Sequence, residues 1–398
     1  MTLPLNGVRV LAFEQYGAGP FGTLYLADLG AEVIKIENPA DGGDMSRAVG
    51  PHFFAPGDSQ FFHSFNRNKR SITLDLTVPE ARAVLHDLAR SADAVACNLR
   101  GDVPAKLGLT YADLKPHNRK IVCAFLSAYG RDGPRAAWPG FDYLMQAETG
   151  YFSLTGEPGG PPSRFGLSIV DLMSGLAMAY GLVSALLAAR ASGEGRDVDV
   201  SLFDVALFNL NYLATWYLNS GFRQDRLERS AHPSLTPCQL YRTADGWIYL
   251  MCNKEKFWPA LCRALERPEW ADDARFRTFA DRLANRPLVN ELVEGELVKR
   301  GTGEWLAIFA GAVPAAPVLD VAQALENPFV TGHNRIFSVP HGATADGSYR
   351  MVAPPVRFAA EGAPQRPAPE LGADTRAVLQ ELGYDTERIS RLKAAGAI

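Results

Sequence analysis

One aspartate, Asp171, stands where an irregular stretch gives way to a segment rich in alanine and leucine. Residues 155–166 (TGEPGGPPSRFG) contain too many helix breakers to be regular, whereas residues 171–190 are predicted to form a helix. A carboxylate near a helix start is stabilised by the helix dipole and can serve as a nucleophile. Because the reference pKa of aspartate is about 3.9, we expect Asp171 to be ionised at neutral pH without special tuning. Its alternative role is a simple helix N-cap.

A glycine motif near the N-terminus suggests a different chemistry. Residues 17–22 (GAGPFG) match GxGxxG between a predicted strand and a predicted helix, and Glu37 follows at about the distance of a dinucleotide fingerprint. In a working fingerprint the strand runs almost directly into the first glycine, whereas Glu14, Gln15 and Tyr16 intervene here. We therefore expect these small residues to let a helix start pack closely on the sheet. A nucleotide-dependent oxidoreductase remains a less favoured alternative.

Composition narrows the class of protein. A chain of 398 residues exceeds the roughly 250–300 at which one core stops growing, so two domains are expected. With 47% hydrophobic residues, 21% charged residues and a net charge of −4, the chain is typical of a globular protein. The sequence contains no dense block of Lys and Arg, so no nucleic-acid partner is expected.

The five cysteines are odd in number and widely spaced in apolar surroundings, which indicates buried free thiols in a reducing compartment. No zinc-type spacing is present, so no metal is expected. We find no basic segment followed by an apolar run at the N-terminus, and no run of about 18 apolar residues. The sequence therefore predicts a cytoplasmic protein with no membrane partner.

Strands and helices alternate over the first 200 residues. This pattern predicts an α/β domain with a parallel sheet that is covered on both faces, and it places ligands at the carboxyl ends of the strands. The expected strands are 8–13, 33–36, 71–76, 94–98, 121–128 and 197–202, and the expected helices include 23–29, 79–92 and one apolar helix over 202–218.

The composition of the sequence changes near residue 221, where charged residues follow the apolar segment. A predicted strand pair surrounds the turn at residues 244–246, and charged helices follow as far as residue 300. We expect a large domain made of residues 1–220 and 326–398, and a smaller α+β domain made of residues 221–325. A helix over residues 374–382 is expected to return to the large domain.

Five stretches in order, taken together, resemble the class III CoA-transferase family, whose members include carnitine, formyl and succinyl CoA-transferases and α-methylacyl-CoA racemases. Weaker similarity continues through residues 243–246 and 314–318, so it covers nearly the whole chain. The five stretches are residues 7–11 (GVRVL) with 18–20 (AGP), 29–37 (LGAEVIKIE), 66–72 (NRNKRSI), 140–143 (GFDY) and 170–175 (VDLMSG).

The resemblance implies an interlocked homodimer with a Rossmann-like large domain, built from both termini, and a smaller middle domain. It also implies that an aspartate, at the position of Asp171, attacks an acyl-CoA thioester and becomes an aspartyl-CoA thioester by way of a mixed anhydride. An acceptor acid then takes the CoA through a second anhydride. Coenzyme A enters only as part of the substrates, and no permanently bound cofactor is implied.

The racemases of this family pair the aspartate with a histidine, and the matching position here is Phe141. Phenylalanine cannot carry a proton, so two-base racemisation lacks one base and a transferase is favoured. His63 or His232 could replace that base only if the fold brought it to the site. A racemase-like isomerase and a non-catalytic CoA-binding protein remain alternatives.

The family places CoA-phosphate contacts around residues 66–70 and lines its active site with the first strand-to-helix loop. A solvated basic turn is the alternative role for the cations, and a helix N-terminal acid is the alternative for Asp142. The candidate CoA contacts are Lys69, Arg70, Asn98, Arg100, Lys106, Gln15, Tyr16 and Ala18, and Asp142 is a candidate for orienting the thioester or a loop.

The acceptor acid is less well specified by the sequence. A dicarboxylate needs a cation near its distal carboxylate, and Arg47, Arg164, Arg223 and Arg229 are candidates that no spacing separates. Residues 231–239 (AHPSLTPCQ) are similar to a segment of family members that use succinyl-CoA with itaconate, malate, citramalate or glutarate. We therefore expect CoA transfer from succinyl-CoA to a small carboxylic or dicarboxylic acid, or to a sulfinate analogue.

Overall fold

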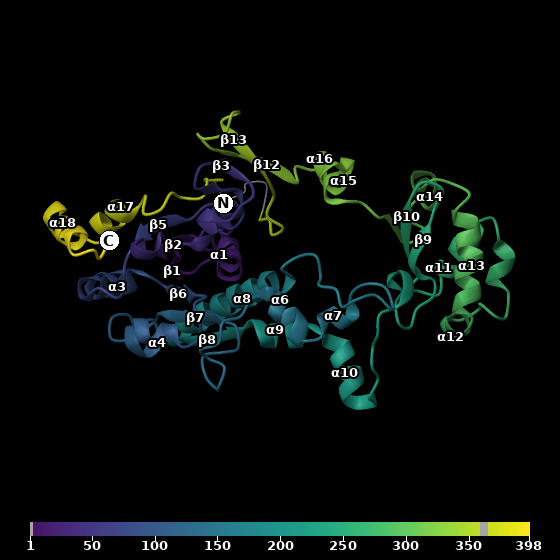
Figure 1. The fold of residues 1–398 in the computed structure, drawn as a ribbon, viewed down its shortest axis with the longest axis horizontal. Coiled ribbons are helices and arrows are strands. Elements are labelled where there is room, and N and C mark those ends of the chain that lie inside the picture. The colour runs from purple at the N-terminus through teal and green to yellow at the C-terminus, as the bar shows by residue number, and fades with distance from the viewer. Residues whose placement is uncertain (1–2, 359–364) are drawn as a thin grey trace. The chain divides into compact units, whose positions relative to one another are not determined.

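The computed structural model describes residues 3–358 and 365–398, and it contains two compact units (Figure 1). The first unit comprises Met1–Thr149, Phe165–Asn211 and Asn334–Ile398, and the second comprises Gly150–Arg164 and Tyr212–His333. The boundaries expected from composition fall at residues 220 and 325. Composition does not anticipate that residues 150–164 group with the second unit.

The first unit is built on a six-stranded parallel sheet, as the alternation of strands and helices predicts. Most of its central positions are Val, Ile, Leu or Ala, because helices cover both faces of the sheet. The chain order reverses between β1 and β6, and the crevice beside such a reversal is where ligands bind in open α/β sheets. The strand order is β5 (Arg70–Thr73), β2 (Glu32–Glu37), β1 (Arg9–Phe13), β6 (Ala94–Cys97), β7 (Val122–Ser127) and β8 (Arg196–Ser201).

Helices α1 (Ala18–Asp28) and α8 (Ile169–Ser192) pack closely against each other. A Cβ added at Gly22 would lie 2.4 Å from the Gly175 carbonyl oxygen, and a Cβ added at Gly175 would lie 2.4 Å from the Ala18 carbonyl oxygen. Only glycine allows two backbones to approach this closely. The glycines of residues 17–22 therefore serve close packing, as expected, although at Gly22 the partner is α8 rather than the sheet.

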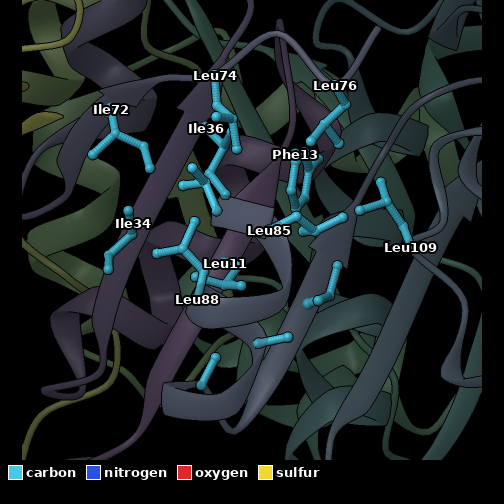
Figure 2. Close-up of a cluster of buried hydrophobic side chains, with 14 of the residues drawn as sticks. Leu11, Phe13, Ile34, Ile36, Ile72, Leu74, Leu76, Leu85, Leu88 and Leu109 are labelled. Atoms are coloured by element: carbon cyan, nitrogen blue, oxygen red, sulfur yellow. The ribbon is translucent and has the colours of Figure 1, made fainter. Parts of the chain in front are cut away.

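The main hydrophobic core lies between the sheet and α3 (Pro79–Ser91), where Leu85 and Leu88 pack against side chains of β1, β2 and β5 (Figure 2). Val378 and Leu379 belong to the same core, so the C-terminal segment completes the first unit. The remaining elements of this unit are α2 (Gln60–Asn66), α4 (Val103–Leu107), α5 (Tyr111–Leu114), α6 (Asp142–Glu148), α9 (Leu202–Asn209), α17 (Thr375–Glu381), α18 (Thr386–Ala394), β3 (Phe53–Ala55), β4 (Asp58–Ser59), β12 (Ile336–Pro340) and β13 (Ser348–Val352).

By length and composition α8 could cross a membrane. Its contacts with α1, β7 and β8 give a sufficient reason for its apolar character. The single helix expected over residues 202–218 is wrong, because the chain breaks between α9 and α10 (Asn211–Ser220), where Asn211 has a φ of +45°. A left-handed residue cannot continue a right-handed helix.

The second unit contains a three-stranded antiparallel sheet in the order β11-β10-β9, and it has its own core around Trp258, Phe276 and Trp305. The strand pair predicted around residues 244–246 is confirmed as β9 and β10. Its elements are α7 (Tyr151–Leu154), α10, β9 (Cys238–Arg242), β10 (Trp247–Met251), α11 (Phe257–Ala264), α12 (Phe279–Ala284), α13 (Arg286–Leu297), α14 (Thr302–Phe309), β11 (Ala315–Pro317), α15 (Val321–Glu326) and α16 (Pro328–Thr331).

Candidate active site

A cavity of about 240 Å³ lies at the carboxyl ends of β1, β6 and β7, and Asp171 forms part of its wall. The loop after β1 contributes residues 15–18, the end of β6 contributes residues 98–100, and β7 contributes residues 126–128. The loop before α6 closes another side with residues 138–141. The cavity is therefore located at the strand-order reversal, where an α/β sheet is expected to bind its ligand.

Asp171 is the third residue of α8, and the N-cap of this helix is Ser168. The capping is supplied from another helix, because Asp142 Oδ2 accepts the backbone N–H groups of Val170 at 2.7 Å and Asp171 at 3.0 Å. The Asp171 side chain is thus not needed as a cap. A Cβ added at Gly17 would lie 3.4 Å from Asp171 Oδ2, so the carboxylate also faces the start of α1.

The protonation of Asp171 differs from the sequence-based expectation. Burial, followed by the charge of Asp142, raises the pKa of Asp171 to about 7. The expectation of an ordinary aspartate pKa is therefore wrong, because removal from water and a neighbouring carboxylate outweigh the helix dipole. At neutral pH the carboxyl is divided between its ionised and protonated forms.

The loop after β1, which lines the cavity, is held by hydrogen bonds to two side chains. The Gln15 N–H donates to Asn98 Oδ1 at 2.8 Å, and Asn98 Nδ2 donates to the Gln15 carbonyl at 2.9 Å. Tyr16 adopts a φ of +68° and its N–H donates to Asp44 Oδ1 at 3.0 Å. Of the predicted contacts, the structure thus brings Gln15, Tyr16, Ala18, Asn98 and Arg100 to the wall that contains Asp171.

Lys69 and Arg70 are not in this cavity. The Lys69 side chain is fully buried and its Nζ donates to Glu14 Oε1 at 2.7 Å and to the Asn66 side chain at 3.0 Å. Burial lowers the pKa of Lys69 to about 8 despite the carboxylate beside it. The Lys69 amino group is thus held by internal partners, and its contact with CoA stays a prediction.

Arg70 holds the C-terminal segment. Its guanidinium pairs with Glu381 at 2.8 Å and Glu32 at 2.6 Å, and its Nε lies 3.5 Å from Asp374 Oδ1. Arg70 lines a different cavity, of about 1330 Å³, together with Arg47. Three carboxylates thus engage the charge of Arg70, and its contact with CoA stays a prediction.

Arg100 and Lys106 both remain on the surface and share one acid. Arg100 Nε lies 2.5 Å from Asp102 Oδ1, and Lys106 Nζ lies 2.5 Å from Asp102 Oδ2. The group carries two positive charges and one negative charge, and of its members Arg100 lines the cavity. Unlike Lys69, these cations are exposed to an incoming anion.

Sequence reasoning did not identify Met45 and Trp138, which also line the cavity. Both side chains are about half exposed, and the Arg135 guanidinium lies 4.8 Å from the Trp138 ring. The proximity of Trp138 to the GFDY stretch was an available signal for that residue. No local pattern marks Met45, which reaches the cavity only through the fold.

His63 does not replace the second base that the site lacks because residue 141 is a phenylalanine. His63 Nε2 lies 2.7 Å from Asp58 Oδ1, its Nδ1 lies 3.1 Å from the Tyr349 hydroxyl, and burial lowers its pKa. His341 Nε2 approaches the other Asp58 oxygen at 3.0 Å, while its Nδ1 accepts the Ala343 N–H at 3.2 Å.

Asp58, His63 and His341 each bring one ligand atom within 4.8 Å of the others, which is an arrangement that could hold a metal ion. Since the Ala343 N–H can only donate, Nδ1 of His341 must be unprotonated and Nε2 must carry the hydrogen. That hydrogen faces Asp58, so the nitrogen has no lone pair for a metal. The geometry favours a hydrogen-bonded network over a metal centre.

The arginines considered for the acceptor acid are divided between the units. Arg47 pairs with Glu37 at 2.7 Å and donates to the Pro369 carbonyl at 3.0 Å, so its guanidinium is engaged. Arg164, Arg223 and Arg229 belong to the second unit, where Arg229 pairs with Glu294. His232 also lies there, and its carbonyl accepts from Arg286 at 2.8 Å.

Comparison with known proteins identifies the class. Residues 5–375 match the model of CoA-transferase family III. A succinate–glutarate CoA-transferase from Agrobacterium fabrum is 35% identical over 390 residues, which cover 95% of this chain and 96% of the relative. An acetyl-CoA:oxalate CoA-transferase from Acetobacter aceti is 35% identical over 383 residues, 95% of each chain.

Solved structures agree with this assignment. A CAIB/BAIF family protein from Brucella suis superposes with a TM-score of 0.80 at 32% identity, covering 96% of this chain and 100% of the other. Rv3272 from Mycobacterium tuberculosis gives a TM-score of 0.82 at 31% identity, covering 94% and 98%. The chain therefore belongs to CoA-transferase family III, and it is an enzyme that transfers CoA between an acyl-CoA and an acid.

Proposed function

We propose that this enzyme moves CoA from succinyl-CoA to a small dicarboxylic acid through a covalent aspartyl-CoA thioester at Asp171. The observation that carries the proposal is the placement of Asp171 in the wall of the cavity, beside the N-termini of both α1 and α8. Support for the substrate class comes from relatives named succinate–glutarate CoA-transferase and succinyl-CoA:glutarate CoA-transferase. A sulfinate analogue of the acceptor would carry a similar charge.

The reaction begins when ionised Asp171 attacks the thioester carbonyl carbon. The C–S bond breaks, the CoA thiolate leaves and a mixed anhydride forms. The thiolate then attacks the Asp171 carbonyl carbon, which releases succinate and leaves aspartyl-CoA. The acceptor carboxylate reverses the two steps, so CoA departs on the new acyl group and Asp171 is regenerated.

The start of α1 is suited to the charge that develops on the carbonyl oxygen. The N–H groups of the first helical turn have no partner within the helix and are positive at this end. Gly17 and Ala18 are at that start, and both line the cavity with Asp171. We assign their backbone amides to the stabilisation of the oxyanion.

For CoA itself we retain Arg100 and Lys106 as phosphate contacts and Asn98, Gln15, Tyr16 and Ala18 as wall residues. An approaching phosphate would compete with Asp102 for the two cations, which are exposed and not neutralised as a group. The half-exposed face of Trp138 adds flat apolar surface at the same cavity.

We also propose that the enzyme is an interlocked homodimer in the cytoplasm. Tyr180 and Leu187 of α8 are 78% and 65% exposed, and Phe208 of α9 is 79% exposed. Large apolar side chains in this number on neighbouring helices are expected to be covered by a partner. The five cysteines are all free and buried, which fits a reducing compartment.

The test is intact mass after mixing the protein with succinyl-CoA and no acceptor. We expect wild-type protein to gain the mass of CoA less one water, because one Asp171 oxygen leaves in succinate. Hydroxylamine should remove the CoA, and Asp171→Ala should show no gain. The exposed Asp132→Ala serves as the matched control and should behave as wild type. A gain that persists in Asp171→Ala would place the covalent step elsewhere. No gain with any acyl-CoA would contradict the covalent mechanism.

A further inference from the structure

Asp142 contacts the backbone of the proposed nucleophile directly. The residue is only 3% exposed, and one carboxylate oxygen accepts the N–H groups of both Val170 and Asp171. The other oxygen accepts from the side-chain amide of Gln146, one turn further along α6. The first N–H groups of α8 have no partner within the helix, and Asp142 caps two of them.

Gln146 extends the same contact to the segment that enters α8. Its Nε2 also donates to the Leu167 carbonyl at 3.1 Å, and its Oε1 accepts the Phe165 N–H at 2.9 Å. Residues four apart lie on one face of a helix, so Asp142 and Gln146 form a clamp that holds residues 165–171. The two members differ in charge, and this allows their roles to be separated.

We propose that Asp142 is a positioning residue that favours the acylated form of Asp171, an inference that rests on the function proposed above. Ionised Asp171 places a negative charge beside a second, buried carboxylate. In the net step, Asp171 carboxylate and succinyl-CoA become aspartyl-CoA and succinate. The succinyl C–S bond breaks, an aspartyl C–S bond forms, and one Asp171 oxygen leaves in succinate. The negative charge leaves with that product, so the repulsion is relieved.

The electrostatics of the site support this direction. Burial and Asp142 raise the pKa of Asp171 to about 7, so the neutral carboxyl is more favoured here than in an ordinary aspartate. A neutral anhydride or thioester gains from the same environment for the same reason. Other charged groups near the cavity are engaged by partners. Glu14 is paired with Lys35 and Lys69, Asp44 with Lys35, and Arg100 with Asp102, while Asp204 accepts from the Ser201 hydroxyl. The titratable Tyr16 lines the wall.

The equilibrium ratio of aspartyl-CoA to free enzyme, measured by intact mass at a fixed ratio of succinyl-CoA to succinate, tests the inference. Asp142→Asn keeps an oxygen for the two N–H groups but removes the charge, and we expect it to lower the ratio about tenfold, the equivalent of one pKa unit. Gln146→Ala loosens the clamp but keeps the charge, and the ratio should stay near the wild-type value. An unchanged ratio in Asp142→Asn, or an equal loss in both variants, overturns the inference.

A second measurement needs no substrate. The ¹³C resonance of the Asp171 carboxyl, identified by its loss in Asp171→Asn, should titrate near pH 7 in wild type and at lower pH in Asp142→Asn. If Asp142→Asn does not fold, wild-type titration near the reference value of about 4 still overturns the inference, because the Asp171 carboxylate would then not be disfavoured by its surroundings. A wild-type adduct with an unchanged ratio in Asp142→Asn overturns only this inference, whereas no adduct in wild type overturns the proposed function as well.

Discussion

Replacing Asp171 by asparagine should abolish transfer and, at the same time, stabilise the protein above pH 7. The folded-state pKa of Asp171 is raised from 3.8 to about 7, mainly by burial and then by Asp142. A raised carboxyl pKa means that the folded protein is most stable with the group protonated. That stability is fully present below the unfolded pKa, and it is lost as the pH rises to the folded pKa.

The magnitude follows from the size of the shift. A rise of about three units corresponds to about 4 kcal/mol once Asp171 is fully ionised, and to about 2 kcal/mol at pH 5, where only the unfolded state has lost its proton. Asparagine has nearly the same shape and no charge, so it avoids this cost. The gap in unfolding free energy between Asp171→Asn and wild type should open between pH 4 and 7 and stay constant above that range.

Urea unfolding followed by circular dichroism at pH 5 and pH 8 measures the gap, with the exposed Asp132→Asn as control. We expect a larger gap at pH 8 than at pH 5 for Asp171→Asn and no gap at either pH for the control. A gap that is the same at both values, or a less stable Asp171→Asn protein at pH 8, would show that the Asp171 carboxylate is not disfavoured by its surroundings.

Three further predictions concern other parts of the first unit and the cysteines. Gly175→Ala places a Cβ 2.4 Å from a backbone oxygen of α1 and should destabilise the protein by about 1–3 kcal/mol, whereas Gly295→Ala, in open space, should not; equal melting temperatures would contradict the close packing. Lys69→Met removes a buried partner of Glu14 and should cost about 3–5 kcal/mol in urea unfolding. A raised KM for succinyl-CoA with unchanged stability would instead identify Lys69 as a CoA contact. All five thiols are buried, and burial raises the pKa of each. The native protein should therefore react slowly with a disulfide reagent, and all five thiols should react only when the protein is unfolded. Rapid modification of one thiol in the native protein would mean that this thiol is exposed.

Much of the fold could be predicted from local patterns. The alternation of apolar strands and helices predicts the parallel sheet of the first unit, because strands buried on both faces appear as short apolar runs. The ordered motifs correctly indicated the family, which the comparison confirms. The break at Asn211 was missed because the apolar residues on both sides of it read as one continuous helix, although asparagine adopts the left-handed region more readily than most residues.

The candidate site was predicted less completely. The sequence predicted that Asp171, the loop with Gln15, Tyr16 and Ala18, and the end of β6 lie near one another, since a parallel sheet gathers its strand ends at one edge, and all of them line one cavity. The ion pairs of Lys69 and Arg70 could not be predicted, because a basic run has the same sequence appearance on the surface and in the interior. Their internal carboxylate partners come from distant parts of the chain.

The sequence by itself determined which chemistry was available: an aspartate at the start of a long helix, a phenylalanine in place of a histidine, and glycines where two helices meet. Only the tertiary structure decided the state of that aspartate. Its pKa depends on the water removed around it and on Asp142, 29 residues away in the chain. Burial and through-space charge are properties of the folded environment, and no local pattern of residues encodes them.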